Sequence, residues 1–339
     1  MNNHARAFTY RAGVRVQGTI VACDATAGSD LIFLSHARAL GARAARALPR
    51  ARGGKRQVLA TELTLALLGP PGDRRRPCAL LAPLGRPFGL GSLRLELFAS
   101  GAMPGAASLL CEAGARRVVY AGPIGPNPGV RPAQALCVDA TFGWRRFSFP
   151  PPAEALAQLR SLVTEALAAR RAPVVLFDSP GSALDAGREL AAAGIAVRAH
   201  RTFLQAASVF GGAGLAAPAL QRFEGQLKPG EALLWPREAR GAPRLRALTA
   251  PVVVLASPWA AEPAAMAGAS ADHGVLLSER ADFAGLVRYV EASGASEVAL
   301  VGSPGDELAA ALRSRGADTY VLGPPRQIAL FATAGAPAT

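Results

Sequence analysis

The sequence has few of the side chains that bind transition metals or act as general bases. Its 339 residues include only four histidines, which are His4, His36, His200 and His273. Because these histidines lie in unrelated segments, the pattern offers no Ser/His/Asp or Cys/His arrangement for nucleophilic catalysis.

Cysteine is equally scarce. The four cysteines are Cys23, Cys78, Cys111 and Cys137. They are far apart, they form no Cys-x-x-Cys pair, and none lies at zinc-finger spacing from a histidine. We therefore expect buried, apolar-like thiols in a reducing compartment.

Long uncharged apolar runs are also missing. No such stretch reaches the roughly 20 residues that span a bilayer, and the polar, basic residues 1–13 are followed by no apolar run. We expect a cytoplasmic protein without membrane partners. Since 50% of the residues are hydrophobic, the chain can fill one large core or two ordinary ones, and two lobes are the starting expectation.

Lysine is almost absent, since Lys55 and Lys228 are the only two, yet the net charge is +13. Nearly all of this positive charge is arginine, and two interpretations compete. Clustered cations could follow a phosphate backbone, whereas a GC-rich genome would place arginine on any solvated face. The clustered cations are Arg43, Arg46, Arg50, Arg52, Lys55, Arg56, Arg74–Arg76, Arg116, Arg117, Arg145 and Arg146.

Short apolar runs bounded by Gly, Pro or charged residues recur through residues 1–147. Their length and β-branched content predict strands of a buried sheet. The predicted strands are Val14–Cys23, Leu31–Leu34, Gln57–Ala60, Leu93–Ala99, Ser108–Glu112, Arg117–Ala121 and Ala135–Asp139. Helical patterns intervene at Ala37–Leu48 and Glu62–Leu68, so this part is predicted to be strand-rich α/β.

A linker follows at Phe149–Pro152, where three consecutive prolines can continue neither a strand nor a helix. Beyond it, helical patterns alternate with apolar runs, which predicts βαβ units and a parallel sheet. The predicted elements are a helix at Ala153–Arg171, a strand at Pro173–Phe177, a turn at Ser179–Gly181 leading into a helix that ends at Ala193, and strands at Ile195–Ala199, Ala232–Trp235 and Val252–Ala256.

Two later stretches are predicted to be irregular, namely the glycine cluster Gly211–Gly214 and the small residues between Pro263 and Val275. Regular structure then resumes. The predicted elements are helices at Phe283–Ser293 and Asp306–Arg315, strands at Glu297–Val301, Thr319–Leu322 and Gln327–Phe331, and a frayed tail at Thr333–Thr339.

Six short strings stand out for their order and spacing along nearly the whole chain. They are Leu31–Leu40 (LIFLSHARAL), Leu59–Thr64 (LATELT), Leu95–Ala106 (LELFASGAMPGA), Val119–Pro123 (VYAGP), Asp139–Gly143 (DATFG) and Leu277–Phe283 (LSERADF). The first resembles the strand and loop that carry the His-x-His-x-Asp-His motif of metallo-β-lactamase-fold hydrolases. The other five resemble, in the same order, later motifs of the β-CASP nucleases within that superfamily. The resemblance is strongest to the bacterial branch that includes ligase-associated DNA exonucleases and messenger-RNA 3′-end-processing-like factors.

The resemblance implies an α/β fold, a four-layer αββα metallo-β-lactamase sandwich with an inserted β-CASP-like parallel α/β lobe. On this interpretation residues 1–147 form the first part of the core and residues 148–271 the inserted lobe. Residues 272–332 return to the core, and residues 333–339 form a flexible tail.

Members of this family hydrolyse phosphodiesters with two zinc ions held by histidine and aspartate. His36 occupies the first histidine position of the motif. The other motif positions carry Arg38, Leu40, Gly41, Ala102, Pro123, Glu279, Arg280 and Gly302. We therefore expect no catalytic residue, no bound cofactor and no metal, with His36 and Glu279 as the only residual ligand candidates. A single salvage site that adds Asp272 and His273 is the alternative, although the match at Ala281–Phe283 puts that pair out of register.

The substituted arginines suggest a structural role. A guanidinium standing where a zinc ion stood would pair with nearby carboxylates and hold the former ligand loops together. The cation–carboxylate cluster expected on this basis is Asp24, Arg38, Asp139, Glu279 and Arg280. In the alternative interpretation, both arginines point to solvent, and His36 is an imidazole held by hydrogen bonds in a polar pocket.

Three functions remain open at this point. The first is a metal-free pseudoenzyme that binds a partner, such as an active paralogous nuclease or a helicase or ligase, or binds DNA or RNA. The second is a residual or altered metal-dependent nuclease or hydrolase. The third is a basic nucleic-acid-binding module in the cleft between the lobes, with phosphate contacts from Arg38, Arg145, Arg146 and Arg280.

Overall fold

The computed structural model describes residues 6–26, 30–40, 48, 57–69, 77, 79–302 and 305–324. A helix was predicted over Ala37–Leu48. Residues 37–40 form a turn instead, and residues 41–47 lie outside the described residues. The clustered cations of residues 43–56 and 74–76, Gly41, Cys78, the predicted strand Gln327–Phe331 and the predicted tail also lie outside them.

The first sheet contains six strands in the order in which they occur in the chain. They are β1 (Phe8–Tyr10), β2 (Val14–Val16), β3 (Val21–Cys23), β4 (Leu31–Phe33), β5 (Gln57–Ala60) and β6 (Ala79–Leu81). The first three strands are antiparallel, and β3 to β6 are parallel. The prediction of one strand over Val14–Cys23 is wrong, because the chain turns between β2 and β3, where Gly18 has a φ of +74° that favours glycine.

The second sheet has seven strands in the order β19-β18-β11-β10-β9-β8-β7. Their bounds are Phe88–Leu90 (β7), Leu93–Ala99 (β8), Ala107–Ala113 (β9), Arg116–Gly122 (β10), Ala135–Asp139 (β11), Glu297–Val301 (β18) and Asp318–Val321 (β19). β7 to β10 pair antiparallel, whereas β10, β11, β18 and β19 pair parallel. The last two strands thus join this sheet after a long excursion of the chain.

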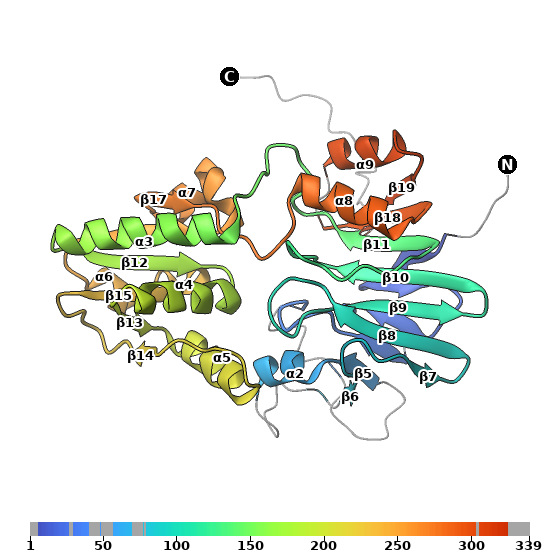
Figure 1. Ribbon diagram of the computed structural model, residues 1–339, viewed down its shortest axis with the longest axis horizontal. Coiled ribbons are helices and arrows are strands. Elements are labelled where there is room, and N and C mark those ends of the chain that lie inside the picture. The colour runs from blue at the N-terminus through green and yellow to red at the C-terminus, as the bar shows by residue number, and fades with distance from the viewer. Residues whose placement is uncertain are drawn as a thin grey trace, which may run out of the picture.

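The two sheets pack face to face around one apolar core, to which β1–β5, β8–β11 and β18 all contribute buried side chains. The outer face of the second sheet is covered by α8 (Phe283–Ser293) and α9 (Asp306–Arg313), which lie beside β11 and β18 in Figure 1. The outer face of the first sheet carries α2 (Glu62–Leu68). Helices therefore flank both sides of the paired sheets.

The third sheet is wholly parallel and has the order β14-β13-β15-β12-β16-β17. Its strands are β12 (Ala172–Phe177), β13 (Ala196–Ala199), β14 (Gln221–Arg222), β15 (Glu231–Pro236), β16 (Pro251–Ala256) and β17 (His273–Val275). One face packs on α3 (Pro152–Ala168), α4 (Pro180–Ala192) and α5 (Arg201–Gly212). The other packs on α6 (Pro243–Arg246) and α7 (Pro263–Ala269), and two 3-10 helices, η1 (Arg237–Ala239) and η2 (Pro258–Ala261), follow β15 and β16. This sheet with its helices forms the left-hand lobe in Figure 1.

The parallel sheet predicted beyond the proline linker is present, and the chain has a mixed α/β fold. Because β17 pairs with β16, the third sheet extends to Val275, beyond the boundary expected after residue 271. Two further predictions are wrong. α5 runs through Gly211 and Gly212, which were expected in a loop, and α7 occupies part of the stretch after Pro263 that was expected to be irregular. α7 is rich in alanine, which favours helix even without a clear apolar stripe, whereas α5 is carried through its glycines by the buried face of Phe203, Ala206 and Phe210.

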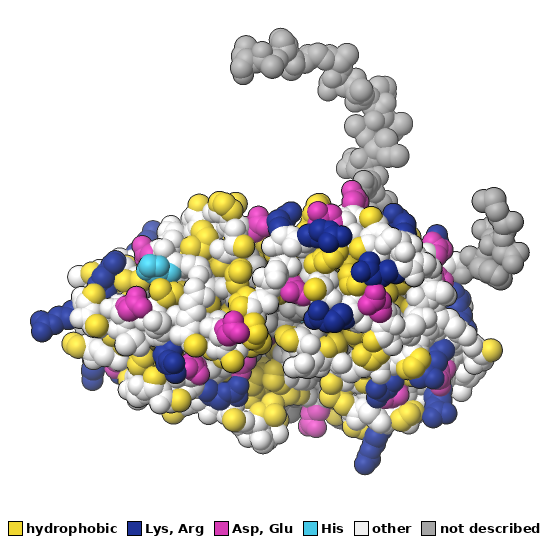
Figure 2. Space-filling model, turned by 45° about the horizontal axis from the view of Figure 1, so that its top comes forward, with side chains coloured by type: hydrophobic (Ala, Val, Ile, Leu, Met, Phe, Trp, Pro, Cys, Tyr) yellow, Lys and Arg dark blue, Asp and Glu magenta, His cyan; other side chains and the backbone are white. Residues whose placement is uncertain are grey.

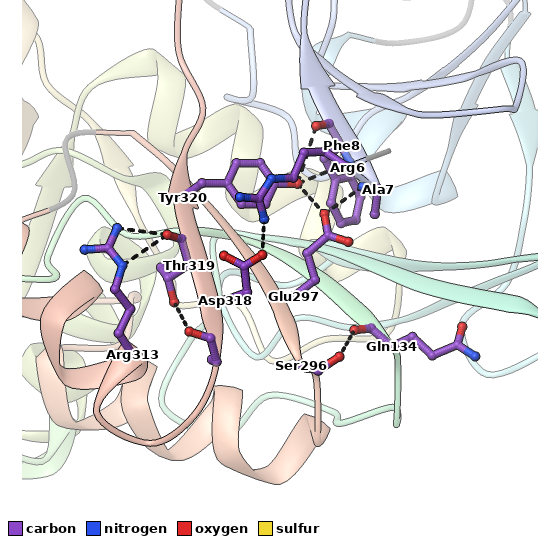
Figure 3. Close-up of polar contacts among 11 residues, drawn as sticks. Arg6, Ala7, Phe8, Gln134, Ser296, Glu297, Arg313, Asp318, Thr319 and Tyr320 are labelled. Carbon is purple, nitrogen blue, oxygen red and sulfur yellow. Dashed lines mark hydrogen bonds and ion pairs between the residues drawn. The ribbon is translucent and has the colours of Figure 1, made fainter. Parts of the chain in front are cut away.

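The segment before β1 is tied to the strands that end the described chain (Figure 3). Glu297 on β18 accepts hydrogen bonds from the Ala7 amide at 2.6 Å and from the Tyr320 hydroxyl at 2.7 Å. Arg6 pairs with Asp318 and lies over the Tyr320 ring, 4.2 Å from its centroid. These contacts link the two sheets at one edge.

None of the described helices combines the length and the apolar character that crossing a bilayer requires.

Candidate functional site

A cavity of about 360 Å³ opens where the two lobes meet. The first lobe contributes loops that follow β4, β8, β10 and β11, and the second contributes the ends of β12 and β16. Its lining residues are His36, Arg38, Ala102, Met103, Pro123, Thr141, Phe142, Asp178, Ser179, Ser182, Ala256, Pro258, Trp259, Leu277, Ser278, Glu279 and Arg280. A second cavity of about 220 Å³ shares His36, Arg38, Pro123 and Arg280 with the first, and Asp24, Asp139 and Gly302 also line it.

Two neighbouring strands of the third sheet end at the cavity in the same way. β12 and β16 are paired in parallel, so their carboxyl ends lie at one edge of the sheet. Each is followed by a serine and a proline that begin a helix, and Ser179 and Ser257 both cap the helix that follows. Crevices at the carboxyl edge of parallel sheets are common binding sites.

His36 is held by a hydrogen-bonded network behind the cavity. Its Nδ1 lies 2.9 Å from the hydroxyl of Ser35. That hydroxyl and the Ser35 amide both donate to Asp24, at 2.6 and 2.8 Å, and the Tyr120 hydroxyl also donates to Asp24 at 2.8 Å. Burial, together with the nearby charges of Arg280 and Arg38, lowers the pKa of His36 to about 4 against the opposing effect of Asp139, so the imidazole is neutral at pH 7.

The carboxyl of Asp24 is therefore satisfied by neutral donors. Burial raises its pKa above the usual value, and the three hydrogen bonds act in the opposite direction. No arginine is among its hydrogen-bond partners in the described part of the chain. Asp24 was expected to pair with an arginine, but its carboxyl binds Ser35 and Tyr120 instead.

Arg280 reaches the other carboxylate of this region. Its guanidinium donates to Asp139 Oδ2 at 2.8 Å, which is one of the pairings that the sequence suggested. Asp139 Oδ1 accepts from the amide of Thr141 at 3.0 Å and from its hydroxyl at 2.5 Å. The pair connects the end of β11 to the segment that returns from the second lobe.

Gly302 packs directly against this pair. A Cβ at residue 302 would lie 2.6 Å from Thr141 Oγ1 and 2.8 Å from Asp139 Oδ1, and the φ of Gly302 is +89°. Both the space and the backbone conformation therefore require glycine. The position that the family resemblance gives to a histidine has no room for any side chain.

Glu279 turns away from both arginines and binds the second lobe. Its Oε2 accepts a hydrogen bond from the Ser179 hydroxyl at 2.6 Å, at the start of α4. Burial raises the pKa of Glu279, and hydrogen bonds from Ser179 and Ser182 oppose that shift. A carboxylate is favoured at the amino end of a helix, so Glu279 stabilises the junction of the lobes and does not act as a partner for Arg38 or Arg280.

Arg38 has a longer ion-pair contact than Arg280, the other arginine that lines the cavity. Its guanidinium lies 3.8 Å from Glu238, and its side chain is 47% exposed. The expectation that Arg38 binds Asp24, Asp139 or Glu279 is therefore wrong. It sits on the loop after β4, and a long exposed side chain gains little from closing on a buried carboxylate that already has its donors.

The other predicted residues are placed apart from the cavity or are apolar within it. Ala102 and Pro123 line it without offering a donor atom, and Leu40 packs with β4 and β5. Arg145 lies over Phe283, and Arg146 pairs with Glu262 at 2.8 Å and stacks on Trp144 and Phe147. Neither lines the cavity, so these two candidates for phosphate contact are not brought together with Arg38 and Arg280.

The alternative metal site is not assembled. Asp272 accepts from the Val253 amide at 2.8 Å, and His273 is exposed on β17. Neither is a lining residue of the cavity that contains His36 and Glu279. Across the described residues, no three side chains of His, Cys, Asp or Glu are grouped so that they could hold a metal ion.

Many of the lining residues were not predicted as site residues from the sequence, among them Trp259, Phe142, Asp178 and Ser182. Trp259 and Phe142 pack at 4.9 Å between ring centroids, one from each lobe, and form an aromatic wall of the cavity. Asp178 accepts from the Ser257 hydroxyl and lies 3.4 Å from Arg237. Ser182 lies in the first turn of α4. The repeated Ser-Pro that follows β12 and β16 is the signal that would have pointed to this edge of the sheet.

The surface does not carry one continuous basic patch on the face seen in Figure 2, where arginines are interspersed with carboxylates. Many of the arginines are in ion pairs, for example Arg315 with Glu291 and Arg160 with Glu189. General charge therefore gives less guidance than the residues of the cavity.

Part of the chain is similar to a known protein. No protein-family model matches the chain. A protein described as a probable DNA ligase from Opitutus terrae is 26% identical over 198 residues, which is 58% of this chain. The matched segment is 20% of the ligase, so the chain corresponds to only one fifth of the length of that relative.

Proposed function

We propose that this chain is a metal-free homologue of the β-CASP nucleases that binds DNA in the cavity between its lobes. The observation that carries the proposal is the composition of the cavity, where two guanidinium groups and one neutral imidazole stand beside two carboxylates, Asp178 and Glu279, that already have hydrogen-bond partners. Arg38 and Arg280 supply positive charge, while Ala102 and Pro123 occupy two of the ligand positions of the family. This set suits phosphate oxygens better than a metal ion.

Zinc does not fit the residues present. The close approach of Gly302 to Asp139 and Thr141 removes one ligand position outright, and proline and alanine remove two others. The two carboxylates of the larger cavity are already engaged, Glu279 with Ser179 and Asp178 with Ser257 and Arg237. No catalytic step through a metal is therefore proposed.

DNA is preferred over RNA because the relative at 26% identity is described as a probable DNA ligase. For the same reason the proposed protein partner is a DNA ligase. The chain spans only one fifth of that relative. We therefore propose that it binds DNA together with a ligase, and we do not propose that it catalyses ligation.

The test is the affinity for internally labelled single-stranded and duplex DNA, measured by fluorescence anisotropy at several salt concentrations. Arg38→Ala should raise Kd by about 3- to 10-fold and reduce the salt dependence by about one phosphate contact. Arg315→Ala is the matched control, because Arg315 is equally exposed at 47% and lies away from the cavity. Equal loss in both variants, or metal-dependent cleavage of the DNA, would contradict the proposal.

A further inference from the structure

The direction of each hydrogen bond behind His36 can be assigned. The Asp24 carboxylate accepts from the Ser35 amide, which can only donate, and from the hydroxyls of Tyr120 and Ser35. Ser35 has a single hydroxyl proton, and this proton is engaged in the hydrogen bond of 2.6 Å that Ser35 donates to Asp24. The Ser35 oxygen is therefore an acceptor toward His36, and Nδ1 carries the proton of the imidazole.

This assignment fixes the tautomer of His36. In a neutral imidazole with a proton on Nδ1, the other ring nitrogen, Nε2, is an acceptor with a free lone pair. Both cavities are lined by His36, and the only hydrogen bond of its side chain among the described residues is made through Nδ1. His36 Nε2 is thus an acceptor without a partner among the described residues, and it shares both cavities with the donors Arg38 and Arg280.

A ligand that satisfies all three groups must carry anionic oxygens and, next to them, a hydrogen-bond donor. Phosphate oxygens meet the guanidinium groups, but an unbroken DNA backbone contains no donor at all. Phosphodiesters and the deoxyribose ring offer only acceptors. A free hydroxyl, at either end of a strand, is the one backbone donor that DNA possesses.

We propose that His36 Nε2 accepts a hydrogen bond from the free hydroxyl at the end of a DNA strand, while Arg280 and Arg38 bind the adjoining phosphates. This inference rests on the proposed function, because it names the part of DNA that the same cavity takes. The chain would therefore bind DNA ends that carry a hydroxyl in preference to ends that carry a phosphate. A terminal phosphate is disfavoured, because at pH 7 its oxygens are mostly ionised acceptors that would face the lone pair of Nε2.

The experiment uses the full chain and oligo(dT) of about 12 nucleotides with an internal fluorophore, so that exocyclic amino donors are absent and the N3–H donor of thymine is the same in every probe. Four linear probes carry hydroxyl or phosphate at the 3′ and the 5′ end, and a circular oligo(dT) has no end. We expect the hydroxyl at one of the ends to lower Kd by about 3- to 10-fold relative to phosphate there, as for one hydrogen bond. General attraction to positive charge predicts the opposite order, since the phosphate adds negative charge.

Variants separate the acceptor from the rest of the site. His36→Phe keeps a ring but removes Nε2 and should abolish the preference for hydroxyl ends, whereas His36→Gln supplies an amide oxygen and should retain part of it. His273→Phe, at an exposed histidine of β17, should retain all of it. Circular dichroism checks that each variant is folded.

The outcomes are distinguishable. Binding of all the linear probes and the circle with equal affinity, or preference for the phosphate end, would overturn the inference and leave DNA binding by the cavity intact. A preference for hydroxyl that survives His36→Phe would also overturn it. Failure of every probe to bind would overturn the proposed function as well.

Discussion

Glu279 and Arg280 are consecutive in the chain, yet their side chains bind opposite lobes. Glu279 accepts from Ser179 at the start of α4, in the lobe of the third sheet, at 2.6 Å. Arg280 donates to Asp139 at the end of β11, in the lobe of the paired sheets, at 2.8 Å. The returning segment is thereby fixed to both walls of the cavity by two short side-chain contacts.

The contact between Arg280 and Asp139 should be measurable as a coupling energy. Removing one partner leaves a partly buried charge without compensation, so Arg280→Met and Asp139→Asn should each reduce the free energy of unfolding by about 1 to 3 kcal/mol. The double variant should lose less than the sum of the two, by about 1 kcal/mol. Urea unfolding of the four proteins gives the cycle, and strict additivity would show that the pair contributes nothing.

A histidine at residue 302 should destabilise the protein and bind no metal. Gly302→Ala and Gly302→His place an atom within 3 Å of Thr141 and Asp139 and also strain the backbone. Gly194→Ala is the matched control, because Gly194 has a φ of +77° and an open Cβ position. We expect about 1 to 2 kcal/mol of destabilisation at Gly194 from φ alone and a larger loss at Gly302, measured by thermal unfolding. Equal losses would mean that the close approach relaxes without strain.

His36 should make the fold sensitive to acid. Its pKa is about 4 in the folded protein and about 6.5 when unfolded, so the unfolded state binds more protons between these values. The stability due to the neutral imidazole is complete above pH 6.5 and is lost as pH falls toward 4. Between pH 7 and 4.5 the wild type should lose about 2 kcal/mol more than His36→Gln, by urea unfolding at each pH. A constant difference between the two proteins across this range would contradict the lowered pKa.

Chelation should leave the protein unchanged if it is a metal-free homologue. Removal of bound structural or catalytic zinc would withdraw binding energy from the folded state and lower the thermal midpoint. We expect EDTA to shift the midpoint by less than about 1 °C and elemental analysis of protein purified without chelator to find near-zero zinc, iron and manganese. About one or two ions per chain would show that ligands outside the matched positions have been overlooked.

Much of the secondary structure could be read from local patterns. The parallel third sheet followed from apolar runs that alternate with helical ones, and α3 from leucine and valine at helical spacing. The prediction failed where local signals are weak. α7 begins at a proline and consists of small residues, and β1 to β3 are only three residues long, so neighbouring strands and not their own sequence decide their limits.

The site was predictable only in part, because the sequence does not say where a long side chain will point. Arg280 was expected to pair with Asp24, Asp139 or Glu279, and the structure selects Asp139. Arg38 and Glu279 could not be placed, since each had several partners within reach and Glu279 found a helix terminus in the other lobe. The tautomer of His36 depends on Ser35, Asp24 and Tyr120, which come together only in the folded sheet pair.

The pairing of β11 with β18 has a consequence for synthesis on the ribosome. The two strands match residue by residue from Ala135 with Glu297 to Asp139 with Val301, although the whole lobe of β12 to β17 lies between them in the chain. That lobe has a complete sheet and can fold as soon as it emerges, whereas β11 waits with an open parallel edge. During synthesis, the β18 side of β11 therefore stays unpaired until the last strands of the second sheet have been made.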